Sequence, residues 1–312
     1  MRRRFLISAV TTWLCLMTYG CAWAAGGVPI WVALSESGGP HVEAATALVA
    51  EVDQAQAGRV DWRIAHWSQF GRSNPEPAWI IAVGTAALKG MQELYGRDAT
   101  PPPLLAILVP RLAFERMADP MRLRAGSLSA VFLDQPPARQ LDLIRLALPD
   151  ARSVGILVSG QSKAHAPALD AAARERGLQL VSSVVEPGGL YPALQSLLPD
   201  IDVLLAQPDP VVFNSQSAGN ILTAAYRRQV PLVGFSSAYV KAGALLALYS
   251  TPAQVGARGG EVLRQVLAGR PLPGPQPPRD FAVEVNQNVA RSLGLVLDES
   301  RLGEQLRAKD RP

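Results

Sequence analysis

The sequence predicts an α/β protein built as two doubly wound lobes, each with a parallel sheet, and the order of its segments carries this prediction. From Val28 onward, short apolar segments alternate with turns and helical stretches. Runs such as Val154–Val158 are apolar throughout, without polar alternation. Strands that are buried on both faces, as in parallel sheets covered by helices, have this pattern. Short links between strand and helix also imply right-handed crossovers.

The candidate strands fall into two groups along the chain. The first group comprises Val28–Leu34, Val60–Ala65, Trp79–Val83 and Leu104–Val109. A helical stretch to about Ala57 follows the first of these strands, and an Ala/Leu/Met helix follows the third. In the second group, strands begin at Ser153, Leu178, Asp202 and Val230, with helical segments between them.

Two lobes fit the chain length better than one sheet of about ten strands, because twisted open sheets rarely exceed ~10 strands. We expect the break at Arg122–Val131, with residues 25–124 in the first lobe and residues 125–245 in the second. The segment Pro271–Pro278 can be neither helix nor central strand. It is interpreted as an exposed connector between lobes, with a partner-binding polyproline segment as the alternative. Residues 299–312 are predicted to be a charged, frayed tail.

The N-terminal residues 1–24 have the three parts of a secretory signal peptide. Arg2–Arg4 are basic, Phe5–Met17 is apolar, and Ala22-Trp23-Ala24 resembles a cleavage site. The apolar run is too short for a membrane span, which needs ~20 apolar residues. We therefore predict a soluble periplasmic protein. Twin-arginine export and lipid anchoring at Cys21 remain as alternatives.

Charge and cysteine content exclude several classes of protein. Setting aside Arg2, Arg3 and Arg4 leaves 27 basic and 26 acidic side chains, so the mature chain is nearly neutral. This balance gives no support to a nucleic-acid or membrane-surface partner. Both cysteines, Cys15 and Cys21, lie in the leader, so no disulfide or thiol nucleophile is expected after cleavage.

The sequence contains no recognisable catalytic motif. The histidines His41, His66 and His165 form no HxH or HExxH pattern, so no metal site is predicted. There is no G-x-S-x-G elbow and no G-x-x-x-x-G-K-[ST] phosphate loop. We predict neither an enzyme nor a cofactor.

Small polar residues follow several predicted strands, where an open parallel sheet forms its ligand crevice. The helices that begin there also direct free N–H groups at the crevice, which suits an anionic group. The same residue types are favoured simply as helix N-caps. The candidate ligand-binding residues in these turns are Ser35, Glu36, Ser37, Gly84, Thr85, Ser159, Gln161, Gln207, Asp209, Ser236 and Ser237.

The segment Asp134–Leu180 resembles the second-lobe entry of ABC-transporter substrate-binding proteins of the tryptophan/tyrosine-binding type. The resemblance covers most of Val28–Leu297 and continues through Asp202-Val203-Leu204-Leu205 with Asp209, Val230-Pro231-Leu232-Val233-Gly234, Val240-Lys241-Ala242-Gly243-Ala244-Leu245 and Ala290-Arg291-Ser292-Leu293-Gly294-Leu295. It implies a type I periplasmic-binding-protein fold with three crossings between lobes and a ligand in the cleft. It also implies that the chain returns to the first lobe for about residues 246–270 and ends in the second lobe with about residues 271–298.

Three segments at the cleft edge depart from the family pattern. Val109-Pro110-Arg111 replaces an Asp-Pro pair, Ser127-Leu128-Ser129 replaces Thr-Gly, and Tyr249-Ser250-Thr251 replaces an acidic-aromatic pair. The identity of the ligand is therefore left open. Tyr249 is a candidate for stacking on a ring, and Arg111 is a candidate carboxylate clamp because its guanidinium is a fork donor.

The function predicted from these observations is capture of a small polar or zwitterionic, amino-acid-like ligand between two lobes. Helix N-termini with Ser37, Thr85 and Ser236 would hold the anionic end, and Asp209 or Glu36 the cationic end. The resemblance implies an inner-membrane ABC permease and ATPase as partners, and we expect a monomer. The alternative is a periplasmic sensor or accessory binding protein without a transport role.

Overall fold

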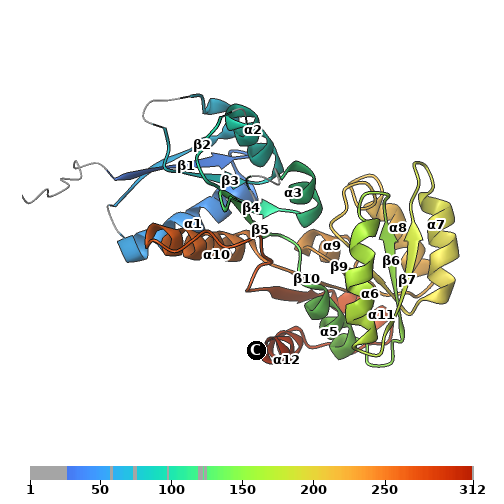
Figure 1. Cartoon of the computed structure of the whole chain (residues 1–312). Helices are drawn as coiled ribbons and strands as arrows, with labels where there is room; N and C mark the ends of the chain where they lie inside the picture. The colour runs from blue at the N-terminus through green and yellow to red at the C-terminus, as the bar shows by residue number, and fades with distance from the viewer. Residues whose placement is uncertain are drawn as a thin grey trace, which may run out of the picture.

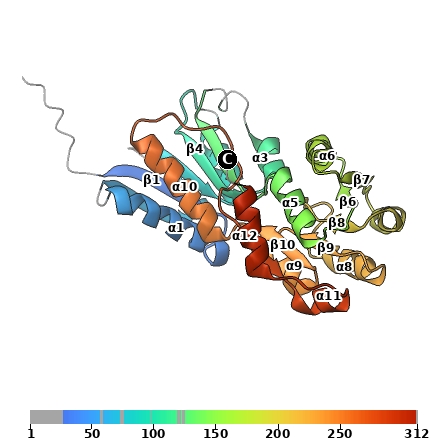
Figure 2. The same cartoon turned by 90° about the horizontal axis from the view of Figure 1, so that it is seen from below.

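The computed structural model describes residues 27–56, 59–72, 76–96, 98–118, 122 and 125–310. Two α/β lobes lie side by side, and each has helices on both faces of its sheet (Figures 1 and 2). The predicted fold class is thereby confirmed. The predicted signal peptide, with Cys15 and Cys21, lies outside the described residues. Within the described part of the chain, no helix is long and apolar enough to span a membrane.

The first sheet has five parallel strands in the order β2-β1-β3-β4-β5. Its strands are β1 (Val28–Leu34), β2 (Val60–His66), β3 (Trp79–Val83), β4 (Leu104–Val109) and β5 (Leu128–Phe132). One face packs against α1 (Gly39–Gln56) and α10 (Pro252–Leu267), and the other against α2 (Thr85–Tyr95) and α3 (Arg111–Met117). A short 3-10 turn, η1 (Trp67–Gln69), follows β2.

Burial on both faces explains why β1 is apolar throughout. Ile30 and Val32 belong to the core under α1 and α10, whereas Trp31 and Ala33 belong to the core under α2. All four side chains are at most 5% exposed. Because successive side chains of a strand point to opposite faces, a strand between two helical layers needs apolar residues at every position.

The second sheet has six strands in the order β11-β10-β9-β8-β6-β7, and only β11 runs antiparallel to its neighbour. Its strands are β6 (Ser153–Val158), β7 (Gln179–Val184), β8 (Val203–Leu205), β9 (Leu232–Gly234), β10 (Leu246–Tyr249) and β11 (Ala282–Val285). Its helical elements are α5 (Pro137–Ala147), η2 (Lys163–His165), α6 (Ala166–Arg174), α7 (Leu190–Leu197), η3 (Leu198–Asp200), α8 (Ala218–Arg227), α9 (Ser237–Ala242), α11 (Gln287–Ser292) and α12 (Glu299–Lys309).

Three segments lie in a different lobe from the one predicted. β5 was expected in the second lobe, which was predicted to start at residue 125. It pairs with β4 and so belongs to the first sheet. β10 pairs with β9 in the second sheet, whereas it was expected in the first lobe. Gln276 of the proline-rich segment bridges to Val131 of β5, so this segment runs along the first sheet before the chain reaches β11. Backbone hydrogen bonds decide which sheet a strand joins. The pattern of apolar residues along the chain does not reveal these bonds.

The charged C-terminal segment is a helix and not the frayed tail that was predicted. Asp298 caps α12, because its carboxylate accepts a hydrogen bond from the Arg301 N–H at 3.0 Å. Leu302 and Leu306 are buried in the core that α5 shares. Their four-residue spacing puts both leucines on one helix face. These leucines dock an otherwise charged helix on the core of the second lobe.

Candidate functional site

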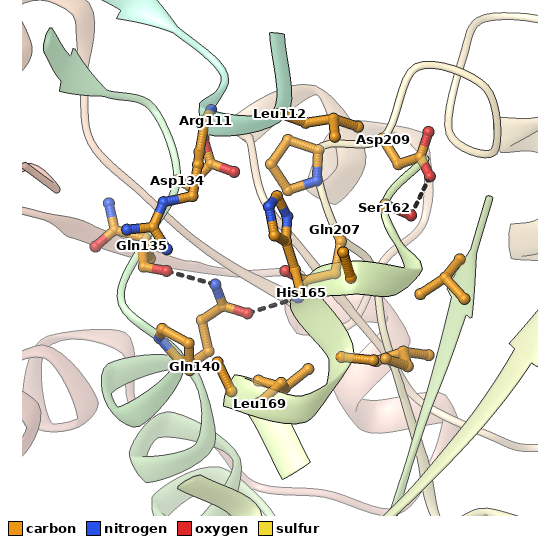
Figure 3. Close-up of a pocket in the computed structure, with 17 residues that line it drawn as sticks. Arg111, Leu112, Asp134, Gln135, Gln140, Ser162, His165, Leu169, Gln207 and Asp209 are labelled. Atoms are coloured by element: carbon orange, nitrogen blue, oxygen red, sulfur yellow. Dashed lines mark hydrogen bonds between the residues drawn. The ribbon is translucent and has the colours of Figure 1, made fainter. Parts of the chain in front are cut away.

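Two adjoining cavities lie between the lobes, at the carboxyl ends of the strands. The larger has a volume of about 470 Å³ and is lined by the start of α1, the end of β4, and the ends of β8, β9 and β10. The smaller, of about 150 Å³, lies between α3 and the loop from β6 to α6 (Figure 3). Asp134, Gln135, Gln140 and Pro208 line both cavities. A ligand in this cleft would therefore contact both lobes and the chain that joins them.

The wall of the larger cavity is mainly apolar. Its apolar side chains include Leu108, Pro110, Leu133, Leu205, Val233, Phe235 and Leu248. Its polar side chains are His41, Asp134, Gln135, Gln140, Ser236, Ser237, Tyr249 and Ser250. Such a wall suits a ligand with an apolar body and a few polar groups.

Leu108 enters the larger cavity from a strained backbone. Its φ is 58°, a conformation that bulky L-residues rarely adopt. The register between β4 and β5 shifts at this residue, between Ile107 and Val109. A bulge of this kind re-aims a side chain, and strain of ~1–3 kcal/mol is typically retained at functional sites. The strained residue thus marks the same cleft as the cavities do.

Six of the thirteen residues predicted from the sequence line the cavities. Arg111, Gln207 and Asp209 line the smaller one, and Ser236, Ser237 and Tyr249 line the larger one. The other seven lie outside both linings, namely Ser35, Glu36, Ser37, Gly84, Thr85, Ser159 and Gln161.

Ser35 and Gly84 have structural roles in the first lobe. The Ser35 hydroxyl accepts a hydrogen bond from the Ala87 N–H at 2.9 Å and so caps α2 from a neighbouring strand. Gly84 has a φ of 91°, and a Cβ there would lie 2.5 Å from Ser35 Oγ and 2.6 Å from His41 Nε2. Both residues thus have a role in the packing of the strand ends.

A Ser35→Ala variant separates these roles. We expect it to lower the free energy of unfolding by about 1 kcal/mol, the usual effect of losing a helix cap. Ligand affinity should be unchanged, since Ser35 lines neither cavity. Urea denaturation and calorimetric titration measure the two quantities, and a loss of affinity without a loss of stability would contradict the capping role.

Asp209 was expected to hold a cationic ligand group, but its carboxylate is occupied by its own lobe. One oxygen accepts hydrogen bonds from Ser159 N–H at 3.0 Å and from the Ser162 hydroxyl at 2.5 Å (Figure 3). The other oxygen accepts from Val211 N–H at 2.9 Å. Burial works to raise the pKa of Asp209, but the hydrogen bonds from Ser162, Ser159 and Val211 outweigh it and leave the pKa lowered. This carboxylate joins two loops of the second lobe.

The hydroxyl groups of Tyr249 and Ser236 differ in whether they already have a hydrogen-bond partner within the protein. The Tyr249 hydroxyl donates to Glu284 at 2.7 Å, and burial together with Glu284 raises the pKa of Tyr249 to about 12. Ser237 opposes this rise in the pKa of Tyr249. Ser236 precedes α9, yet its hydroxyl makes no capping bond there. Ser236 therefore keeps a hydroxyl available at the cavity wall.

Asp134 is the main functional candidate that sequence reasoning missed. It lies two residues after the end of β5 and lines both cavities. One of its oxygens accepts a hydrogen bond from the Arg111 N–H, at the start of α3, at 2.6 Å. Burial raises the pKa of Asp134 to about 6, against the opposing effect of this hydrogen bond and of the charges of Arg111 and His165. Its position two residues beyond an apolar strand was the available signal.

The raised pKa gives Asp134 a predictable effect on stability. The folded pKa of about 6 lies above the ordinary 3.8, so its contribution to stability is complete below pH ~4 and is lost as the pH rises through about 6. At pH 7.5 the ionised carboxylate should cost ~1–3 kcal/mol. We expect Asp134→Asn to raise the melting temperature at pH 7.5 but not at pH 4. Equal shifts at both pH values would contradict the assignment.

A chain of hydrogen bonds links the smaller cavity to the crossings between lobes. Gln207 donates to Gln140 at 2.6 Å, and Gln140 donates to the Gln135 carbonyl at 2.7 Å (Figure 3). Gln135 in turn donates to Ser250 at 2.9 Å, and Ser250 donates to the Asp280 carbonyl. Gln135, Ser250 and Asp280 lie on the first, second and third crossings. The cavity wall is thus bonded to all three hinge segments.

Arg139 reinforces the same hinge. Its side chain is 6% exposed and donates to the Gln135 side chain at 2.7 Å and to the Pro278 carbonyl at 3.1 Å. It also donates to the Arg279 carbonyl and pairs with Asp310 at 2.5 Å. A buried guanidinium with several acceptors holds the crossings in one arrangement. Among the described residues, no group of three or more His, Cys, Asp or Glu side chains forms a metal site.

Solved structures with the same two-lobe fold are widespread. A conserved domain protein from Vibrio cholerae matches with a TM-score of 0.60 and 16% identity over 89% of this chain and 98% of that one. A ligand-free, open substrate-binding protein with adhesive properties from Clostridium difficile has a TM-score of 0.64 and 18% identity, covering 88% and 96%. An ABC domain from Streptococcus pneumoniae in complex with L-Trp has a TM-score of 0.57 and 17% identity, covering 88% and 97%.

The sequence itself identifies the family. No curated protein matches the chain significantly. The family model described as ABC transporter substrate binding protein matches residues 131–307, more than half of the 312 residues. This region contains β6–β11 and the crossings that line the cleft. The chain belongs to the family of ABC transporter substrate-binding proteins.

Proposed function

We propose that this protein captures an amino-acid-like solute between its lobes and delivers it to an inner-membrane ABC permease with its ATPase. The observation that carries the proposal is a cleft cavity lined by both lobes and by the crossings. A ligand that contacts both lobes favours the closed state, because those contacts exist together only when the lobes meet. The family consists of substrate-binding proteins and is not a family of enzymes.

The cavity chemistry favours an apolar side chain on the ligand over the small polar body expected from the sequence. The wall around Leu205, Val233 and Phe235 would surround that side chain. Asp134 would accept hydrogen bonds from the ligand amino group, since Asp209 is already occupied. Ser236 and Arg111 are the available donors for a carboxylate. The pneumococcal neighbour is a complex with L-Trp, which agrees with this chemistry.

The predicted signal peptide supports export of the protein to the periplasm, and substrate-binding proteins of ABC transporters are periplasmic or extracellular. We propose that the mature protein works there as a monomer. Sizing chromatography of periplasmic extracts, with an antibody to the protein, measures both properties. Recovery in the cytoplasmic fraction would contradict the proposed location.

A panel of amino acids tests the proposed ligand class. L-leucine, L-phenylalanine and L-tryptophan should be titrated into the protein, with glycine and L-glutamate as controls for size and charge. A ligand at ~100 times its dissociation constant raises stability by ~2.7 kcal/mol, which gives a measurable rise in melting temperature. We expect the apolar amino acids to produce it and the controls not to. If none does so, the amino-acid class is wrong.

A further inference from the structure

Two side-chain contacts bridge the lobes at the rim of the smaller cavity, apart from the hinge. Arg116 of α3 donates to the Gln161 side chain at 2.7 Å. Glu115 of α3 contacts His165 with 2.7 Å between Oε2 and Nε2. α3 belongs to the first lobe, and the loop from β6 to α6 belongs to the second. Figure 1 places α3 at the junction of the two lobes.

These contacts continue directly into the cavity wall. His165 and Arg111 both line the smaller cavity (Figure 3). Arg111 Nε lies 3.5 Å from the Glu115 carboxylate. Asp134 bonds to the first N–H of α3, which fixes the end of this helix over the cavity. His165 therefore belongs both to a bridging contact and to the wall of the smaller cavity.

We propose that Glu115, Arg116, Gln161 and His165 form a rim latch that holds the lobes together without ligand and thereby sets ligand affinity. The second part of this proposal rests on the proposed function. Ligand affinity is proportional to the fraction of molecules that are already competent to bind. Contacts that favour the closed state raise that fraction, whereas contacts made only to the ligand do not.

The exposure of the latch explains why it can open. Glu115, Arg116 and Gln161 are exposed, and His165 is partly exposed. Water screens such pairs, so each contributes only a small factor to an equilibrium. Two weak contacts would shift the ratio of closed to open lobes about three- to tenfold. A buried pair in this place would lock the cleft instead.

One of these contacts involves a residue that was predicted to bind the ligand. Gln161 was predicted to bind the ligand because it lies in a turn after β6. The oxygen of its side-chain amide accepts a hydrogen bond from Arg116 of the other lobe. A polar residue at a strand end can contact either a ligand or the opposite lobe. The sequence does not show which of these contacts it makes.

A ligand-free distance measurement tests the latch. Spin labels on Lys89→Cys in α2 and Ser196→Cys in α7 report on the separation of the lobes, in a full chain that also carries Cys15→Ser and Cys21→Ser. Two variants remove opposite halves of the latch: Glu115→Ala with Arg116→Ala, and Gln161→Ala with His165→Ala. Asp170→Ala with Arg174→Ala is the matched control, an ion pair within α6.

Each half-latch variant should shift the distance distribution toward longer separations, and the combined variant should shift it no further. Such non-additivity is the signature of groups that interact with one another. The control should leave the distribution unchanged. Unchanged distances in both half-latch variants, or fully additive shifts, would overturn the proposal.

An affinity measurement then tests the functional part. With L-leucine, L-phenylalanine and L-tryptophan as probes, each half-latch variant should bind three- to tenfold more weakly than the parent chain. Unchanged affinity together with longer distances would overturn the link between latch and affinity. If no probe binds the parent chain, the proposed ligand class fails, while the ligand-free distances still decide whether the latch exists.

Discussion

An Asp134→Asn variant is expected to bind apolar amino acids about 10- to 100-fold more weakly than the parent protein. Its carboxylate lines both cavities and already accepts one backbone hydrogen bond, from Arg111. A hydrogen bond to a charged group contributes ~1.5–3 kcal/mol, which corresponds to this range of affinity. Asparagine keeps the size of the side chain and an acceptor for Arg111, but it loses the negative charge that attracts an ammonium group.

Asp202→Asn is the matched control for this prediction. Asp202 also accepts backbone hydrogen bonds, from Arg152 and Ser153, but it lies outside both cavities. The hydrogen bond from Arg152 N–H, with further ones from Ser153, lowers the pKa of Asp202. Its contribution to stability is therefore lost as the pH falls, opposite in sign to that of Asp134. The control should lose stability without losing affinity.

Isothermal titration with L-phenylalanine, and with phenethylamine and 3-phenylpropionate as analogues, measures the role of Asp134 directly. The variant should lose affinity for the two amines and little for the carboxylate. An equal loss for all three compounds would show that the substitution perturbs the cleft as a whole. Unchanged affinity for the amines would exclude Asp134 as the group that binds them.

The second large effect is expected at the contact of α1 with α10. A Cβ on Gly256 would lie 2.1 Å from the Ala44 carbonyl oxygen, and one on Gly260 would lie 2.8 Å from the Leu48 carbonyl oxygen. Ala44 and Leu48 are fully buried. At Gly256 the three nearest atoms all belong to the backbone of Ala44, so no side-chain rotation can make room. The two helices can approach closely only through glycine.

Gly256→Ala should therefore lower the free energy of unfolding by about 2–4 kcal/mol, despite the higher helix propensity of alanine. The matched control is Gly219→Ala in α8, where no atom lies within 4 Å of the added Cβ. That variant should be neutral or up to ~1 kcal/mol more stable. Urea denaturation at constant m-value measures both. Equal effects in the two variants would contradict the packing argument.

The position of α10 gives this contact a wider consequence. The helix follows β10 of the second sheet, yet it packs on α1 of the first lobe. Its entry is fixed by Thr251, which caps the helix by accepting from Gln254 N–H. Loosening α10 from α1 would also release the second crossing between lobes. Destabilisation by Gly256→Ala is therefore expected to widen the separation of the lobes before the protein unfolds.

The sequence could not show which polar residues at the strand ends are already bonded within the protein, because one residue type serves two purposes there. Ser35 and Asp209 both lie at strand ends, as expected, but one caps α2 and the other joins two loops. Serine and aspartate are preferred in such turns whether or not a ligand is near. Asp134 was passed over because β5, the strand before it, was not among the predicted strands; the break between the lobes was expected there instead. The pKa of Asp134 is raised by burial, and its side chain lines both cavities; neither property can be read from the residue pattern.

The sequence by itself determined the architecture of the lobes and the family, because apolar strands buried between helices need a residue pattern that can be read locally. It also predicted that candidate residues lie at the ends of strands, and six of those residues line the two cavities. The tertiary structure decided which sheet β5 and β10 join, which polar groups at the strand ends are already bonded, and which face the other lobe. Sheet membership and the bonding of these polar groups depend on contacts between segments far apart in the chain. Such contacts produce no periodic pattern in the sequence.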